Sequence, residues 1–359
     1  MCLTTYYTKS TTDQIVEAAV SPISGYERKL VNAGEIKNTG VELLLSIKAI
    51  QTKNFEWTST LNWSRNESLV VSLTETTDRF AIKSFGSYVA TYAQVGKSYP
   101  VMYGADWKRD DQGNLLVDAN GRTITVNDQY IGKVSPDWFG GWQNEFKIGN
   151  IAVTALLDFQ KGGLFWSYTD YQGTRDGNTV KSLQGRNEYL FSNWVLGEND
   201  NERKGQLQVA NTNVPGANLT DNYVSYADNQ RVSGVNLPNR IFDESVPYWA
   251  GRESNMNVKP TNFWTDDVSK SMKQFTYDAS YIKLREVTIG YNLPNKVLKK
   301  TPFRSVKVSA VGRNLAILYQ KTPKGLDPQA TSTAGNGQGF EYGFVLPTAT
   351  YGLNINVAF

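Results

Sequence analysis

The chain has 359 residues, of which 40% are hydrophobic, 12% aromatic and 20% charged, and its net charge is +3. So small a charge does not favour a nucleic-acid partner, because nucleic-acid binders present a clustered basic face. Histidine is absent and Cys2 is the only cysteine, which leaves no histidine-based catalytic pair, no cysteine-based zinc site and no intrachain disulfide. We therefore predict a protein that is not an enzyme, without a cofactor, catalytic residues or a metal site.

The apolar residues are spaced for strands and not for membrane-spanning helices. No apolar run approaches the roughly 20 residues of a spanning helix, but barrel strands cross a membrane with alternating patterns. Alternation predicts eight strands, near residues 3–9, 41–49, 55–64, 138–148, 151–159, 287–293, 306–310 and 351–359. We expect the fifth to continue through Trp166. Ile282 and Leu284 are out of phase with the sixth, which predicts a bulge or bend near Arg285.

The third and last predicted strands have the clearest two-faced patterns. The third alternates large apolar residues with polar ones, and its apolar members are Phe55, Trp57, Leu61 and Trp63. The last strand alternates in the same way from Tyr351 to the terminal Phe359. An amphipathic strand that ends on an aromatic residue is typical of the closing strand of a transmembrane barrel, whereas ordinary chain ends are polar. An edge strand of a soluble sandwich is the alternative.

Short and long connections alternate strictly along the chain. The short ones lie near residues 52–54, 149–150 and 294–302, and the long ones are 10–37, 66–136, 169–276 and 316–347. One end of an up-and-down sheet then carries only turns, as in outer-membrane barrels with periplasmic turns and long extracellular loops. This parity predicts that Phe359 lies at the periplasmic end. The inward face would carry Glu42, Lys48, Glu56 and Lys307.

Five aromatic residues are candidates for the girdles at the two membrane interfaces: Trp57, Trp138, Tyr291, Tyr351 and Phe359. Each of them is also compatible with the core of a sandwich. Four basic residues crowd the third short turn, namely Lys296, Lys299, Lys300 and Arg304. They suit lipid headgroups or a periplasmic partner, and ordinary solvation is the alternative.

Two further groups of residues lie in the long connections. An aromatic and charged group in the longest one is a candidate contact for a ligand or a lid protein, with the loop's own core as the alternative: Tyr248, Trp249, Arg252, Phe263 and Trp264. An Asp-rich segment has oxygen ligands that suit calcium but lacks the twelve-residue spacing of an EF-hand, so a turn hairpin is favoured: Asp106, Asp110, Asp111, Asp118 and Asn120.

Several sequence blocks occur in a characteristic order. They are NAGEIKNTGVEL (32–43) with FEW (55–57), IG (131–132) with PDW (136–138), DFQKGG (158–163), YDASYIKLREV (277–287) leading into GYNLP (290–294), GRNL (312–315), DPQ (327–329) and the final Phe359. With these blocks, nearly the whole chain resembles the C-terminal part of SusC/RagA-type TonB-linked outer-membrane transporters of Bacteroidota.

The resemblance implies the C-terminal part of a plugged barrel of about 22 strands, which imports an oligomeric nutrient, glycan or peptide, across the outer membrane. It also implies a SusD-type lipoprotein as a lid, outer-membrane lipid as surroundings, and Phe359 as the signal for the barrel assembly machinery. Residues 1–359 would form one all-β, antiparallel barrel segment, while the plug, signal peptide and N-terminal strands are absent. TonB would act only through that missing N-terminal part. Two alternatives remain: a non-transporting surface binding or adhesion protein, and a non-functional fragment of a truncated gene.

Overall fold

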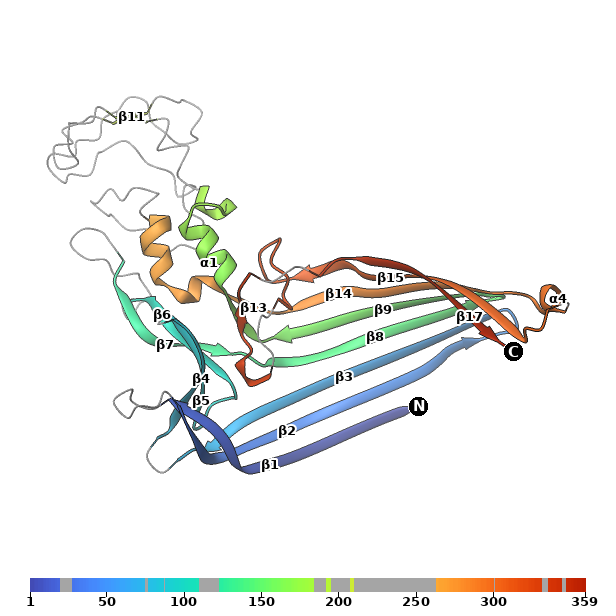
Figure 1. Ribbon diagram of the computed structural model, residues 1–359, viewed down its shortest axis with the longest axis horizontal. Helices are drawn as coiled ribbons and strands as arrows, with labels where there is room; N and C mark the ends of the chain where they lie inside the picture. Colours follow the sequence, from blue (N-terminus) through green and yellow to red (C-terminus); the bar gives the residue numbers. More distant parts are fainter. Residues whose placement is uncertain are drawn as a thin grey trace. The chain divides into compact units, whose positions relative to one another are not determined.

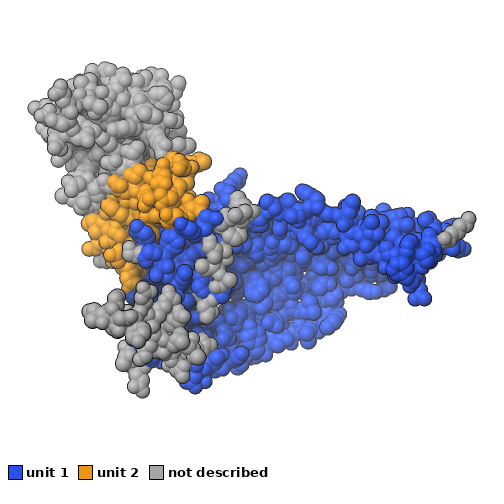
Figure 2. All heavy atoms as spheres, viewed as in Figure 1, with its two compact units in different colours: residues 1–103, 130–166, 276–359 blue, residues 104–129, 167–275 orange. Residues whose placement is uncertain are grey.

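A computed structural model describes residues 1–19, 28–74, 77–86, 88–109, 123–183, 192–194, 207–209, 263–299, 301–330, 335–343 and 347–359. The chain forms two compact units, coloured separately in Figure 2. Unit 1 comprises Met1–Tyr103, Tyr130–Trp166 and Thr276–Phe359, and unit 2 comprises Gly104–Gln129 and Ser167–Phe275. We describe each unit by itself.

Unit 1 is built on an eight-stranded antiparallel sheet whose order is β1-β2-β3-β8-β9-β14-β15-β17. The eight strands run side by side in Figure 1. Their bounds are β1 (Cys2–Ala19), β2 (Arg28–Gln51), β3 (Phe55–Ser72), β8 (Pro136–Ile148), β9 (Ile151–Gly162), β14 (Tyr281–Asn292), β15 (Ser305–Gln320) and β17 (Thr350–Ala358). Each of the eight predicted strands corresponds to one of them, and the predicted antiparallel fold is confirmed.

The strand register gathers apolar side chains on one face of this sheet, which we name the apolar face. Residues that lie opposite each other on paired strands point to the same side. One row of such partners is Leu45, Leu61, Trp142 and Leu157. Another is Phe146, Val153, Ile289, Ala310 and Leu353. Trp142, Ile289 and Leu353 are 41%, 54% and 82% exposed, so this face is open to its surroundings.

The opposite face, which we name the polar face, carries charged side chains. The register places Glu42 beside Ser64, Lys48 beside Thr58 and Lys307 beside Asn356 on this side. Glu56 forms an ion pair with Lys147 at 3.1 Å and a longer one with Lys48 at 3.9 Å. Glu42, Lys48, Glu56 and Lys307 therefore share one face, as the alternation predicts.

All three short connections lie at one end of the sheet, where both chain termini are labelled in Figure 1. Residues 52–54 join β2 to β3, Gly149 and Asn150 join β8 to β9, and a turn containing α4 (Asn295–Leu298) joins β14 to β15. Gly149 has a φ of 56°, which a two-residue hairpin turn requires and glycine adopts without strain.

The first predicted long connection, residues 10–37, is wrong for most of its length. β1 and β2 stay paired from Ser10↔Lys37 to Ala19↔Arg28, so the hairpin continues far beyond the predicted strands. Polar residues such as Thr11, Thr12 and Gln14 hide this extension, because they interrupt the alternation of apolar and polar residues that indicates a strand. Residues 20–27 lie outside the described part.

The predicted continuation of the fifth strand through Trp166 is also wrong. β9 ends at Gly162, and the chain resumes as β10 (Leu164–Ser167) in a separate sheet with β13 (Thr276–Asp278) and β16 (Phe340–Glu341). Gly162 and Gly163 have φ values of 72° and 81°, which break the strand. A Cβ on Gly163 would lie 2.8 Å from the carbonyl oxygen of Val134.

The remaining described elements belong to the long connections. A four-stranded sheet has the order β4 (Arg79–Phe85), β5 (Val89–Gln94), β6 (Val101–Trp107) and β7 (Thr125–Lys133). Near β10 and β6, unit 1 buries Phe165, Trp166 and Met102 almost completely. A short 3-10 turn, η7 (Gly335–Gly337), precedes β16. These connections therefore contain a buried apolar core, while Trp142, Ile289 and Leu353 on the apolar face of the large sheet stay exposed.

Unit 2 is formed by short elements: α1 (Tyr168–Arg175), η2 (Val180–Leu183), β11 (Ser192–Trp194), β12 (Leu207–Val209), η4 (Phe263–Asp267), η5 (Val268–Lys270) and η6 (Met272–Phe275). Tyr171 and Phe275 pack edge to face in its core, with ring centroids 5.3 Å apart. Among the described residues, no helix is long and apolar enough to cross a membrane.

The two faces lead to a matched pair of predictions on β17. Leu353 lies on the apolar face opposite Ala310, and its neighbour Asn354 lies on the polar face opposite Ser309. We expect Leu353→Arg to destabilise the membrane-inserted protein by about 2–4 kcal/mol, because a charged side chain in lipid costs that much near the bilayer centre. Asn354→Arg should cost far less. Urea unfolding in lipid vesicles measures both, and equal effects would contradict the assignment of the faces.

Candidate functional site

A cluster of polar side chains lies on the polar face near the end of the sheet that carries the long connections. We name it the wall cluster, and its members are Asp158, Tyr281, Lys283, Arg285, Asn314, Asp327 and Gln329. β9 supplies Asp158, and β14 supplies Tyr281 and Lys283, with Lys283 directly opposite Asp158. Asp327 and Gln329 come from the connection that follows β15.

A bulge in β14 brings Arg285 into the cluster. The pairing of β14 with β9 shifts between Leu284 and Glu286, so Arg285 has no partner residue in that register. The pairing with β15 shifts at the same place. A bulge re-aims a side chain and bends its strand. The bulge predicted near Arg285 is therefore confirmed, and its effect is to place a guanidinium group beside Lys283 on the polar face.

Arg285 joins three elements through its guanidinium group. Its Nε donates to Asp158 Oδ2 at 3.0 Å, and its Nη2 donates to the same oxygen. Nη1 donates to Asn314 Oδ1 at 2.9 Å, and Nη2 also donates to Gln329 Oε1 at 2.7 Å. Asn314 has a φ of 52°, a left-handed conformation that asparagine tolerates better than most residues. The planar fork of arginine suits such simultaneous contacts.

Lys283 forms a buried ion pair with Asp327. The Nζ–Oδ1 distance is 2.6 Å, and the two side chains are only 6% and 7% exposed. Lys283 Nζ also donates to Gln329 Oε1 at 2.9 Å, and the backbone N–H of Gln329 donates to Asp327 Oδ1 at 2.7 Å. Gln329 Nε2 donates to Tyr281 Oη at 2.6 Å. These bonds fasten the connection after β15 to β14.

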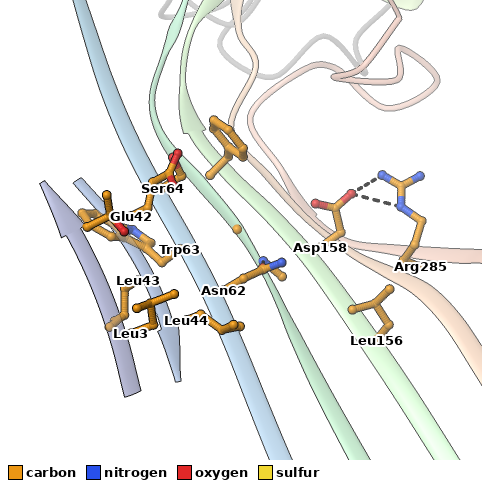
Figure 3. A pocket seen from close by; sticks show the side chains of 14 residues that line it. Leu3, Glu42, Leu43, Leu44, Asn62, Trp63, Ser64, Leu156, Asp158 and Arg285 are labelled. Atoms are coloured by element: carbon orange, nitrogen blue, oxygen red, sulfur yellow. Dashed lines mark hydrogen bonds and ion pairs between the residues drawn. The ribbon is translucent and has the colours of Figure 1, made fainter. Parts of the chain in front are cut away.

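A concavity of about 680 Å³ adjoins the wall cluster on the polar face. Figure 3 shows Asp158 and Arg285 on one side of it, while Glu42, Trp63 and Ser64 lie on the other. Leucines from β1, β2 and β9 also line it, together with Thr5, Asn62, Phe139, Gly140 and Gly141. The concavity therefore combines apolar surface with carboxylate, hydroxyl and guanidinium groups, which is a mixture found in the pockets that bind small molecules.

The charged side chains of the wall cluster are held by one another. Arg285 and Lys283 are held by carboxylates, and no histidine or cysteine lies beside them, because the chain has no histidine and its single cysteine is the exposed Cys2. In the described part of the chain, no group of three or more metal-binding side chains comes together. The geometry supplies a cluster of polar side chains beside a concavity that is partly apolar.

The predicted girdle residues lie on the large sheet or beside it. Trp57 stacks on Phe146 with centroids 5.8 Å apart and donates through Nε1 to Asn144 at 3.0 Å. Trp138 contacts Phe159 edge to face at 5.8 Å. Tyr291, Tyr351 and Phe359 are 46%, 80% and 81% exposed. Tyr291 and Phe359 lie at the end with the short turns, whereas Tyr351, the second residue of β17, is paired with Gly312 in the middle of β15. Their role in membrane interfaces stays a prediction.

Most of the predicted contact residues in the longest connection cannot be placed. Tyr248, Trp249 and Arg252 lie outside the described residues, and Phe263 begins η4. Trp264 is 3% exposed, so its side chain is packed within unit 2. For Trp264, this burial favours the alternative in which the loop forms its own core.

The Asp-rich segment is described only at its first residue. Asp106 accepts a hydrogen bond from Ser271 Oγ at 2.8 Å and lies 3.3 Å from Lys273 Nζ. Its carboxylate thus holds η6 of unit 2. Asp110, Asp111, Asp118 and Asn120 lie outside the described residues.

All members of the wall cluster lie in the sequence blocks that carry the family resemblance, but the sequence alone assigns them no role in binding. Tyr281, Lys283 and Arg285 are polar residues at alternate positions of a strand whose other positions, Ile282 and Leu284, are apolar. That alternation was a signal for a polar wall. Their partners Asp158 and Asp327 are too distant in the sequence to be paired with them without the fold.

The comparisons with known proteins agree with this architecture. No protein-family model matches the chain. TonB-dependent receptors P3 and P26 of Formosa agariphila are 24% and 26% identical to it over 99% of its length, and the chain spans 32% of each relative. A solved structure of the RagAB peptide transporter has a TM-score of 0.64 and 17% identity, covering 100% of this chain and 33% of that chain. The RagAB peptide importer in its closed-closed state gives a TM-score of 0.59 and 18% identity, over 100% of this chain and 33% of that one.

These similarities confirm three sequence predictions. The chain resembles TonB-linked transporters of the SusC/RagA type, it has an antiparallel barrel fold, and its location is the outer membrane.

The buried pair of Lys283 and Asp327 yields a prediction about stability. We expect Lys283→Met to destabilise the protein by about 3–5 kcal/mol, because it leaves the Asp327 carboxylate buried without its cation. The double variant Lys283→Met/Asp327→Leu should recover much of this loss. Arg313→Met is the control, since Arg313 is 64% exposed in its ion pair with Glu286 and should cost at most about 1 kcal/mol. Equal losses for the control and Lys283→Met in urea unfolding would contradict this account.

A second ion pair, which lies outside the large sheet, predicts that the stability of the protein depends on pH. Lys321 Nζ donates to Asp278 Oδ2 at 2.7 Å. Burial alone would raise the pKa of Asp278, but hydrogen bonds from Lys321 and Ser280 outweigh it and hold this pKa below its ordinary value. The hydrogen bond to Asp278 raises the pKa of Lys321.

Because the pKa of Asp278 is lowered by folding, its stabilising effect is present above its ordinary pKa of about 3.9 and is lost as the pH falls through the folded value. Asp278→Asn should therefore lower the thermal midpoint at pH 7, and the difference from wild type should shrink below about pH 4. Lys321→Gln removes the same ion pair but leaves the hydrogen bonds from Ser280, so its difference from wild type should follow the same trend and be smaller. A difference that does not change with pH would refute this assignment.

Proposed function

We propose that the chain forms a section of the wall of an outer-membrane importer of oligomeric nutrients. The observation that carries the proposal is the division of one eight-stranded sheet into an exposed apolar face and a charged polar face. All turns at one end of that sheet are short, and the long connections leave from the other. An apolar exterior and a polar interior are what a barrel wall in lipid requires.

The comparisons support the proposal that this wall belongs to an importer. The relatives named above are TonB-dependent receptors, and the RagAB structures are described as a peptide transporter and importer. By analogy we infer that the cargo is an oligomer, a glycan or a peptide, that TonB supplies the energy, and that a SusD-type surface lipoprotein covers the entrance. We also propose that Phe359, exposed beside Phe303 at 5.4 Å, belongs to the signal for the barrel assembly machinery.

Uptake by the host cell tests the proposal. We expect deletion of the gene to reduce uptake of at least one fluorescent oligosaccharide or oligopeptide from a panel, because the outer membrane otherwise excludes molecules of that size. Complementation with the wild-type gene should restore uptake, and a protonophore should abolish the restored uptake, since transport needs energy from the inner membrane.

Surface binding of the same compounds, measured in protonophore-treated cells, is the control. If deletion abolishes binding but leaves uptake unchanged, the protein is a surface binding or adhesion protein and the importer proposal is wrong. Unchanged binding and uptake for the whole panel would contradict both functions.

A further inference from the structure

The turn between β14 and β15 is unusual in its charge. Residues 293–304 contain Lys296, Lys299, Lys300 and Arg304 and no acidic residue. Lys53, in the turn between β2 and β3, adds a further cation at the same end of the sheet. The long connections, in contrast, contain basic and acidic residues together, as 73–124 and 321–349 show. Positive charge is thus concentrated at the end of the sheet that carries the short turns.

This basic turn has a defined conformation. Leu298 of α4 is 6% exposed, and its carbonyl oxygen accepts hydrogen bonds from the backbone N–H and the hydroxyl of Thr301. The N–H of Arg304 donates to the carbonyl of Ala358 at 2.7 Å, which ties the turn to the end of β17. These bonds order the backbone of the turn at Leu298 and Thr301, and they hold Arg304 beside the end of β17.

Exposed apolar side chains accompany these cations. Val297, between Lys296 and α4's buried Leu298, is 60% exposed. Phe359 is 81% exposed and lies edge to face on Phe303, and Tyr291 at the end of β14 is 46% exposed. In a protein surrounded by water such side chains would be unfavourably placed. Apolar and aromatic residues next to Lys and Arg are typical of a membrane interface.

The acidic groups at this end do not neutralise the turn. Glu56 is paired with Lys147 and Lys48, and Glu145 lies 3.4 Å from Lys147. The basic surface defined by Lys296, Lys299 and Arg304 therefore has a net positive charge directly beside the apolar face.

We propose that Lys296, Lys299 and Arg304 form a binding site for the headgroup of an anionic phospholipid, with Val297 and Phe359 against its acyl chains. The assignment of the turn to one leaflet of the membrane rests on the proposed function. That function places the short turns in the periplasm, and the adjoining leaflet consists of phospholipid. A lipid fits better than a protein partner, because the cations continue directly into the apolar face. Each Lys or Arg near an anionic membrane surface contributes to such binding.

Lipid binding by the purified protein tests this site. Native mass spectrometry would compare phosphatidylglycerol with phosphatidylcholine on wild type and on the triple variant Lys296→Gln/Lys299→Gln/Arg304→Gln. We expect wild type to prefer phosphatidylglycerol and the triple variant to lose at least about tenfold in affinity for it. The matched control Lys37→Gln/Lys97→Gln/Lys324→Gln removes three exposed lysines elsewhere in unit 1 and should keep wild-type affinity. Heat modifiability confirms that each variant is folded.

Three results would overturn the proposal: no preference of wild type for phosphatidylglycerol, unchanged affinity in the triple variant, or an equal loss in the control. If the triple variant keeps its lipid affinity but no longer co-purifies with a periplasmic protein, the surface serves a protein partner and the lipid assignment is wrong. Lipid binding is measured without transport. Normal phosphatidylglycerol binding in a protein that imports nothing would therefore refute the importer and leave this site intact.

Discussion

The structure depends on one constraint, which is that every backbone N–H and C=O group in a lipid bilayer needs a hydrogen-bond partner within protein. The eight strands meet it by pairing each with its neighbour along the sheet from β1 to β17. The side chains then need only alternate, apolar toward lipid and polar toward the interior. In the described part of the chain, β1 and β17 each have one paired neighbour, and an unpaired strand edge is unfavourable in lipid.

The wall cluster shows a second consequence of leaving the apolar side chains outside. A soluble protein stabilises its loops against a central core, but the connection after β15 is fastened to the polar face of this sheet by polar contacts. Lys283, Asp327 and Gln329 use ionic and hydrogen bonds instead to fix the connection after β15. A buried ion pair adds little net stability over apolar packing, but it tolerates few alternative arrangements. The gain is a loop with one defined position beside the concavity.

Sequence reasoning succeeded where one face of a strand is consistently apolar. The alternation around Trp57 and Leu353 located β3 and β17, and the phase change at Ile282 and Leu284 located the bulge at Arg285. It failed for residues 10–19, where the polar residues 10–14 interrupt the alternation, and at Gly162, where backbone conformation and not hydrophobicity ends the strand. The wall cluster could not be predicted, because Asp158, Lys283 and Asp327 meet only once the strands are in register.

The sheet has a further property that follows from its connections. β3 pairs with β8 and β9 pairs with β14, although residues 73–135 and 163–280 separate them. The entropy lost when a flexible loop closes grows only with the logarithm of its length, so doubling such a loop costs about 0.6 kcal/mol. The spacing of the strands along the chain is therefore nearly free to vary on that side. Insertions can accumulate there over evolution while the wall beneath keeps its register.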